Sequence, residues 1–244
     1  MTLLAWFTVA LAGLAIGATS IGGVLVVPAI TAWLDVPLPE AIAASSLAFL
    51  VTGLITVLSW RAPHWRLPRT DTRLLVGALV GAAAGAALAA AVPGSWLRVW
   101  IGGLALLSGL QALRLWHRGA PADTGALHLK PGLVLPLGLL VGAGSALSGT
   151  GGPVMLLPIL LLMRQPMLAS VTTSQAIQIP IALSASATHL VAGRIDGWLG
   201  AGLAAVLLLG ALAGRALARR TGQAPLLALT GIVLAATGVW LLIF

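Results

Sequence analysis

Eight apolar segments make up most of the chain, and they limit it to a small set of folds. Most contain about 20 residues, the length of helix that crosses about 30 Å of hydrocarbon. Only 7% of the 244 residues are charged, whereas about a quarter of a soluble domain is charged. The pattern predicts an all-α polytopic membrane protein and excludes a soluble enzyme, a nucleic-acid-binding domain and a disordered chain. The predicted segments are 3–34, 41–60, 74–92, 96–116, 132–163, 168–192, 198–218 and 224–244.

Two of these segments, 3–34 and 132–163, are longer, at about 30 residues, and glycine-rich sequence interrupts each of them. A continuous helix disfavours so many Gly and Pro residues near its centre. We therefore predict that both segments break within the depth of the membrane. The interruptions read Ala18-Thr19-Ser20-Ile21-Gly22-Gly23 and Leu147-Ser148-Gly149-Thr150-Gly151-Gly152.

A shift of 129 residues lays the second half of the chain on the first. Their Gly and Pro residues agree over about 100 residues without a net gap, although an Ala-, Leu- and Gly-rich composition offers coincidence as the alternative. We predict an N-terminal transmembrane repeat at 1–116, a linker at 117–131 and a C-terminal transmembrane repeat at 132–244. Each repeat has one broken segment and three ordinary ones. Matched positions include Gly13 with Gly142, Gly22 with Gly151, Ser45 with Ser174 and Gly81 with Gly210.

The formal net charge of +8 comes from basic residues in short runs between the apolar segments. If the broken segments are re-entrant hairpins, the main basic clusters share one side, which the positive-inside rule assigns to the cytoplasm. If they cross instead, the last cluster falls on the opposite side. The hairpin model leaves three crossings per repeat, an odd number, and so predicts inverted repeats, as in many secondary transporters. The clusters are Arg61–Arg73, Arg114–Lys130 and Arg215–Arg220.

Non-helical backbone within a membrane must be buried in protein or line a wet cavity. Each break is followed by a new helix, whose first N–H groups are unpaired and whose dipole end is positive. Two such ends predict an anion site that needs no buried cationic side chain. The alternative is close helix packing through small residues. The candidate residues are Thr19, Ser20, Gly22, Gly23, Ser148, Thr150, Gly151 and Gly152.

The segments after the breaks add polar side chains that can donate hydrogen bonds to an oxyanion. Ser45 and Ser46 lie in the first repeat, and Ser174, Gln175 and Gln178 lie in the second. Because Ser174 and Gln178 are four residues apart, they share a helix face. Hydrogen bonding between helices is the alternative role for these groups.

His189 is the one histidine within a predicted span. It could bind an anion or carry a proton, or it could be an interfacial histidine near Arg194 and Asp196. The chain has no Cys, and every acidic residue falls in a predicted loop or at an interface. Buried carboxylates form cation sites in membranes, so we predict no metal site, no cofactor and no enzymatic activity. The acidic residues are Asp35, Glu40, Asp71, Asp123 and Asp196.

Several motifs, taken in order along both halves, resemble the TauE/SafE sulfite exporter family. The resemblance implies a bacterial-type plasma-membrane transporter of sulfite, sulfonates or related small sulfur-containing anions. The motifs are the broken first segment, Ala43-Ala44-Ser45-Ser46, Thr172-Thr173-Ser174 and His189-x3-Gly193-Arg194-Ile195-Asp196.

We therefore predict a multi-pass secondary transporter that exports small anions and has membrane lipid and the anion as partners. A passive anion channel or facilitator with the same site is one alternative, and a membrane scaffold without transport is another. The sequence leaves open the exact anion, the transport direction, the coupling ion and whether the chain forms a homodimer.

Overall fold

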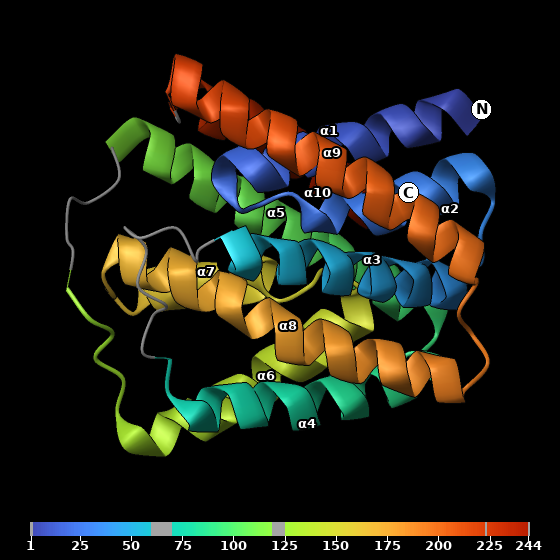
Figure 1. The fold of residues 1–244 in the computed structure, drawn as a ribbon, viewed down its shortest axis with the longest axis horizontal. Coiled ribbons are helices and arrows are strands. Elements are labelled where there is room, and N and C mark those ends of the chain that lie inside the picture. Colours follow the sequence, from blue (N-terminus) through green and yellow to red (C-terminus); the bar gives the residue numbers. More distant parts are fainter. Residues whose placement is uncertain (1, 60–69, 119–124, 223, 244) are drawn as a thin grey trace.

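The computed structural model of the chain describes residues 2–59, 70–118, 125–222 and 224–243, and within these ranges it is helical, without strands. The helices run back and forth across the molecule in one bundle (Figure 1). Their bounds are α1 Thr2–Thr19, the 3-10 turn Gly23–Leu25, α2 Val26–Leu34, α3 Leu38–Ser59, α4 Thr72–Leu88, α5 Gly94–Arg118, α6 Pro131–Ser148, α7 Pro153–Leu162, α8 Met167–Val191, α9 Gly197–Thr221 and α10 Ala224–Ile243.

Six helices in the described ranges are long and apolar enough to cross a membrane: α1, α3, α5, α6, α9 and α10. This confirms the predicted polytopic class. The set differs from the predicted ordinary crossings, because α1 and α6 belong to it while α4 and α8 do not. α4 has 17 residues, and α8 carries polar side chains along its length.

The two arms of each broken segment differ in length. α1 and α6 have 18 residues each, about 27 Å at the usual helical rise. α2 and α7 have 9 and 10 residues, only about 14 Å. The second arm is too short to cross a bilayer. α2 turns back toward the end of the bundle where α1 begins, as a re-entrant hairpin does (Figure 1).

Backbone geometry repeats at positions 129 residues apart. Ser20 and Gly149 follow the first arms with φ of 63° and 62°, in the left-handed region. Asp35 and Arg164 follow the second arms with φ of 53° and 56°. Left-handed residues commonly end helices. The same four stops at matched positions support the predicted repeat.

Two of the acidic residues fix helix starts. The Asp71 carboxylate accepts a hydrogen bond from the Arg73 N–H at 2.8 Å at the start of α4. The Asp196 carboxylate accepts from the Trp198 and Leu199 N–H groups at 2.9 and 3.1 Å at the start of α9. These are N-caps, which satisfy backbone donors that a helix leaves unpaired. Both carboxylates therefore lie at helix ends, as predicted.

The halves pack on each other through matched surfaces: α4 against α6, and α1 against α9. A side-chain carbon added to either of two α4 glycines would collide with a carbonyl oxygen of α6. The later glycine meets the later α6 residue, so the two helices run parallel. The α1–α9 pair uses the equivalent positions. The matched contacts are Gly81 with Leu139 and Gly85 with Ala143, and Gly210 with Ala10 and Gly214 with Leu14.

The equivalent helices α5 and α10 pack on each other and run antiparallel. Gly102 lies against Gly238, and Gly109 lies against Gly231. Equivalent helices that run in opposite directions are what an inverted repeat requires. The packing therefore supports the predicted inversion, although the placement of the halves in a membrane stays a prediction.

Candidate functional site

The two breaks lie against each other inside the bundle. A side-chain carbon added to Gly23 would be 2.7 Å from the carbonyl oxygen of Thr150. Gly151 and Gly152 have φ of 81° and 100°, a conformation that favours glycine. Gly22 instead packs on the α1 backbone, since its added carbon would be 2.8 Å from the Ala12 carbonyl oxygen. Gly23 and Thr150, one candidate residue from each break, are thus brought together, whereas Gly22 is not.

The Phe49 ring fills the space between the breaks. Added carbons on Gly23 and Gly151 would each be 3.0 Å from an atom of this ring, and Phe49 is only 2% exposed. The half-helix ends therefore meet an aromatic ring in the described conformation, and not an open space. The predicted anion site at the breaks stays a prediction.

Most of the candidate hydroxyls already donate within their own helices. Each bonds a backbone carbonyl four residues earlier, a pattern common for Ser and Thr in helices. The hydroxyls of Ser148 and Thr150 are also 2.9 Å apart. Thr19, Ser148 and Thr150 thus bond within the breaks, whereas Ser45 and Ser46 bond within α3. The donors are Thr19 at 2.8 Å, Ser45 at 2.7 Å, Ser46 at 2.9 Å and Ser148 at 2.9 Å.

Ser174 differs from its equivalent Ser45. It is fully buried, and its hydroxyl has no hydrogen-bond partner within the described part of the chain. Buried polar groups without partners are uncommon and call for a physical role. Ser174 lies one turn before Gln178 on the same face of α8, as predicted.

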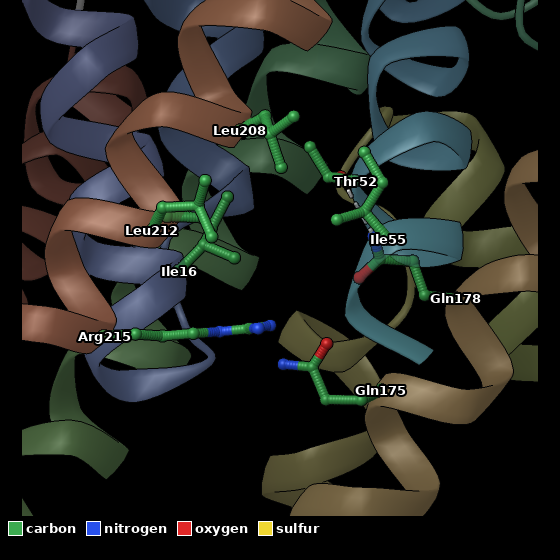
Figure 2. Close-up of a pocket in the computed structure, with 9 residues that line it drawn as sticks. Ile16, Thr52, Ile55, Gln175, Gln178, Leu208, Leu212 and Arg215 are labelled. Atoms are coloured by element: carbon green, nitrogen blue, oxygen red, sulfur yellow. Dashed lines mark hydrogen bonds between the residues drawn. The ribbon is translucent and has the colours of Figure 1, made fainter. Parts of the chain in front are cut away.

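A small polar cavity lies between α1, α3, α8 and α9, and it has room for about one water molecule, at about 10 Å³. Its polar lining residues are Gln175, Gln178, Thr52 and Arg215. Figure 2 shows the Arg215 guanidinium and the Gln175 amide pointing toward each other across it, from α9 and α8. Its apolar lining residues are Ile16, Ile55, Leu208, Ala211 and Leu212.

Gln178 connects this cavity to the breaks. Its amide nitrogen donates to the Phe49 carbonyl oxygen at 2.9 Å and lies 3.4 Å from the Thr52 hydroxyl. Gln178 and Phe49 are also equivalent positions of the two repeats, 129 residues apart. Gln178 therefore links the polar cavity to the residue whose ring separates the two breaks.

Arg215 is the cavity-lining residue that sequence reasoning missed. It was assigned to a cytoplasmic basic cluster, but it lies six residues before the end of α9, about 9 Å inside it. Leu208, Ala211 and Leu212 precede it on the same helix face. This seven-residue spacing from Leu208 was the signal that could have found it. The site thus includes a cationic side chain that the predicted site lacked.

His189 lies apart from the cavity. It is 11 residues beyond Gln178 on α8, about 16 Å along the helix axis. It is fully buried, and neither ring nitrogen has a hydrogen-bond partner among the described residues. The suggested hydrogen bonds of its side chain near Arg194 and Asp196 are therefore absent, although the Arg194 N–H donates to the His189 carbonyl at 3.0 Å.

The described residues contain no group of three His, Cys, Asp or Glu side chains that could hold a metal ion.

Comparison with known protein families matches residues 3–241 to the family described as "Sulfite exporter TauE/SafE". No curated protein and no solved structure matches the chain. The family match spans nearly the whole chain, both breaks and the polar cavity. The chain therefore belongs to the sulfite exporter TauE/SafE family.

Proposed function

We propose that the chain is a secondary transporter that exports sulfite or organosulfonates across the bacterial plasma membrane. The family implies transport of such anions across a membrane. The observation that carries the proposal is the convergence of Arg215, Gln175 and Gln178 on one cavity whose other lining residues are mostly apolar. We further propose that this cavity is the anion site on the cytoplasmic side, because Arg215 lies near the end of α9 that carries Arg219 and Arg220.

The chemistry of the cavity suits an oxyanion. Guanidinium N–H groups form short, charge-assisted hydrogen bonds to anionic oxygens, and amide N–H groups add neutral ones. The apolar side chains around them keep water away, which strengthens the electrostatic attraction. The cavity holds only about one water molecule as described. Binding therefore requires the repeats to move apart, which alternating access provides.

The test is uptake of labelled sulfite by proteoliposomes that contain purified protein. We expect saturable uptake, and accumulation against a sulfite gradient when a proton gradient is imposed. Flux that only dissipates the sulfite gradient and does not saturate would favour the channel alternative. No flux, together with a melting temperature that sulfite leaves unchanged, would favour the scaffold alternative, because an anion bound to the native protein raises its stability.

Variants of two arginines on one helix test the site itself. Replacing Arg215 by Gln removes a charge-assisted hydrogen bond, worth about 1.5–3 kcal/mol or roughly 10- to 150-fold in affinity. Arg219→Gln is the matched control, because Arg219 is exposed and does not line the cavity. Arg215→Lys should retain part of the affinity. Equal affinities in the Arg215→Gln and Arg219→Gln variants would remove the cavity from the proposal.

A further inference from the structure

The repeat relates the cavity to a second region of the protein. Each residue that lines the cavity has an equivalent 129 residues away, and these equivalents lie mainly on α4 and α8. Leu79 corresponds to Leu208, and Ser184 corresponds to Ile55. In transporters with inverted repeats, the two repeats commonly exchange conformations during the cycle. A region that is open in one repeat is then closed in the other, and the reverse holds in the other half of the cycle.

The α4–α8 region is packed shut in the described conformation. The Ser184 hydroxyl donates to the Leu79 carbonyl oxygen at 2.7 Å and joins the two helices. Ala82 and Ala86 are fully buried on α4. Ala211, the equivalent of Ala82, lines the cavity on the other side of the molecule. The two equivalent regions are therefore in different states, one with a cavity and one closed.

The closed α4–α8 region also contains an arginine, but this arginine comes from the loop between α8 and α9 and not from α4. The position equivalent to Arg215 is Ala86, which carries no charge. The Arg194 guanidinium, from the loop between α8 and α9, donates to the Ala86 carbonyl oxygen at 3.2 Å. An arginine therefore reaches the place where the repeat would put the counterpart of Arg215.

Polar side chains without partners are buried at the same end of α8. Ser186 is 6% exposed and His189 is 0% exposed, and they share a helix face. The Ser186 hydroxyl and both His189 ring nitrogens have no hydrogen-bond partner in the part of the chain that the structure describes. Such groups are costly to bury unless they are satisfied in another state or by a ligand.

We propose that the α4–α8 interface is the outer half of the anion pathway, and that Arg194 is its anion-binding cation. This rests on the proposed transport function. When α4 and α8 separate, the bonds from Ser184 to Leu79 and from Arg194 to Ala86 break. The Arg194 guanidinium is then available to an anionic oxygen.

The first experiment measures sulfite uptake from each face of oriented proteoliposomes. Arg194→Gln should raise the half-saturating sulfite concentration at the outer face about tenfold or more and leave the inner-face value unchanged. Arg194→Lys should restore part of the effect. Arg98→Gln is the control, because Arg98 is basic and lies in the first turns of α5, at the end opposite Arg114 and Arg118, which the hairpin model places in the cytoplasm. Identical values at both faces for Arg194→Gln and wild type would overturn the proposal.

The second experiment uses the absence of Cys from the chain. Ala82→Cys should react slowly with a membrane-impermeant thiol reagent added outside, and faster when sulfite drives turnover. Removing the Ser184 hydroxyl, with Ser184→Ala, should also speed its labelling. Labelling that stays slow while wild-type sulfite transport proceeds would overturn the outer pathway and leave the transport function standing. If wild type moves no sulfite, the proposed function itself fails.

Discussion

Ser20 and Gly149 are equivalent positions of the two repeats that have the same backbone conformation but different side chains. Both have φ near 60°, although Ser20 has a side chain and Gly149 has none. A non-glycine residue in this conformation costs about 1–2 kcal/mol. The repeat with glycine avoids this cost, whereas the repeat with serine keeps a hydroxyl next to the break.

Ser20→Gly is therefore expected to raise the free energy of unfolding by about 1 kcal/mol. The reverse change, Gly149→Ser, should lower it, because an added carbon there would be 3.0 Å from a Val27 methyl group. Thermal unfolding of the detergent-purified variants measures both effects. A Ser20→Gly protein that is more stable but transports poorly would place the hydroxyl in the anion site. A less stable one would contradict the strain argument.

Gln178 offers a second test at this scale, through its amide donor. Gln178→Glu should weaken sulfite binding more than Gln178→Ala does. A carboxylate cannot donate to the Phe49 carbonyl oxygen, and its negative charge repels the anion in a site that is costly to desolvate. Isothermal titration of the two variants compares their affinities. Equal affinities would show that Gln178 lies away from the bound anion.

At the scale of helices, glycine ridges determine how closely α4 approaches α6. An added carbon on Gly81 would collide with the Leu139 carbonyl oxygen, which belongs to rigid helical backbone. Small residues allow helices to pack this closely in membranes. Gly103 on α5 is the contrasting case, since an added carbon there would meet no atom within 4 Å.

Gly81→Ala should lower the free energy of unfolding by an overpacking cost of about 1–3 kcal/mol, and the melting temperature should fall with it. Gly103→Ala should leave stability unchanged or raise it by up to about 1 kcal/mol, because alanine is the better helix former. The affinity for sulfite in the folded fraction should be the same in both variants. A Gly81→Ala protein that melts normally would mean that α4 and α6 can separate at little cost.

The helices could be placed from the sequence because apolar length and glycine breaks have direct physical meaning. The predicted segment 168–192 became α8, Met167–Val191, and 224–244 became α10, Ala224–Ile243. The candidate site was harder to predict. Hydrophobic pattern does not show that the Phe49 ring separates the breaks. It can place Arg215 on the helix face of Leu208, but it does not show that this face meets Gln175 of α8. Both depend on which neighbouring helix packs opposite.

At the scale of the molecule, the directions of the helices place the start of α1 and the end of α10 at the same end of the bundle (Figure 1). The last turns of α3, α5 and α9 lie at the other end (Figure 1). This arrangement is the one that the hairpin model and the positive-inside rule predict together.

Single-Cys labelling in intact cells tests this topology. A Cys added after the C-terminus should react with an impermeant reagent from outside. A Cys at Gly222, which has no atom near its added carbon, should react only after the cells are permeabilised. A C-terminal Cys that requires permeabilisation would exclude the hairpin model for the second half.

The pairing of α1 with α9 has a consequence for biosynthesis. α1 ends at Thr19, but α9 begins only at Gly197, so the first helix leaves the ribosome long before its partner is made. During that interval the glycine-lined face of α1 has only lipid or the insertion machinery to contact. A chain released before α9 is synthesised would retain this uncovered face. Such products should be preferred substrates for membrane quality-control proteases, and neither half of the gene should give a stable protein when expressed alone.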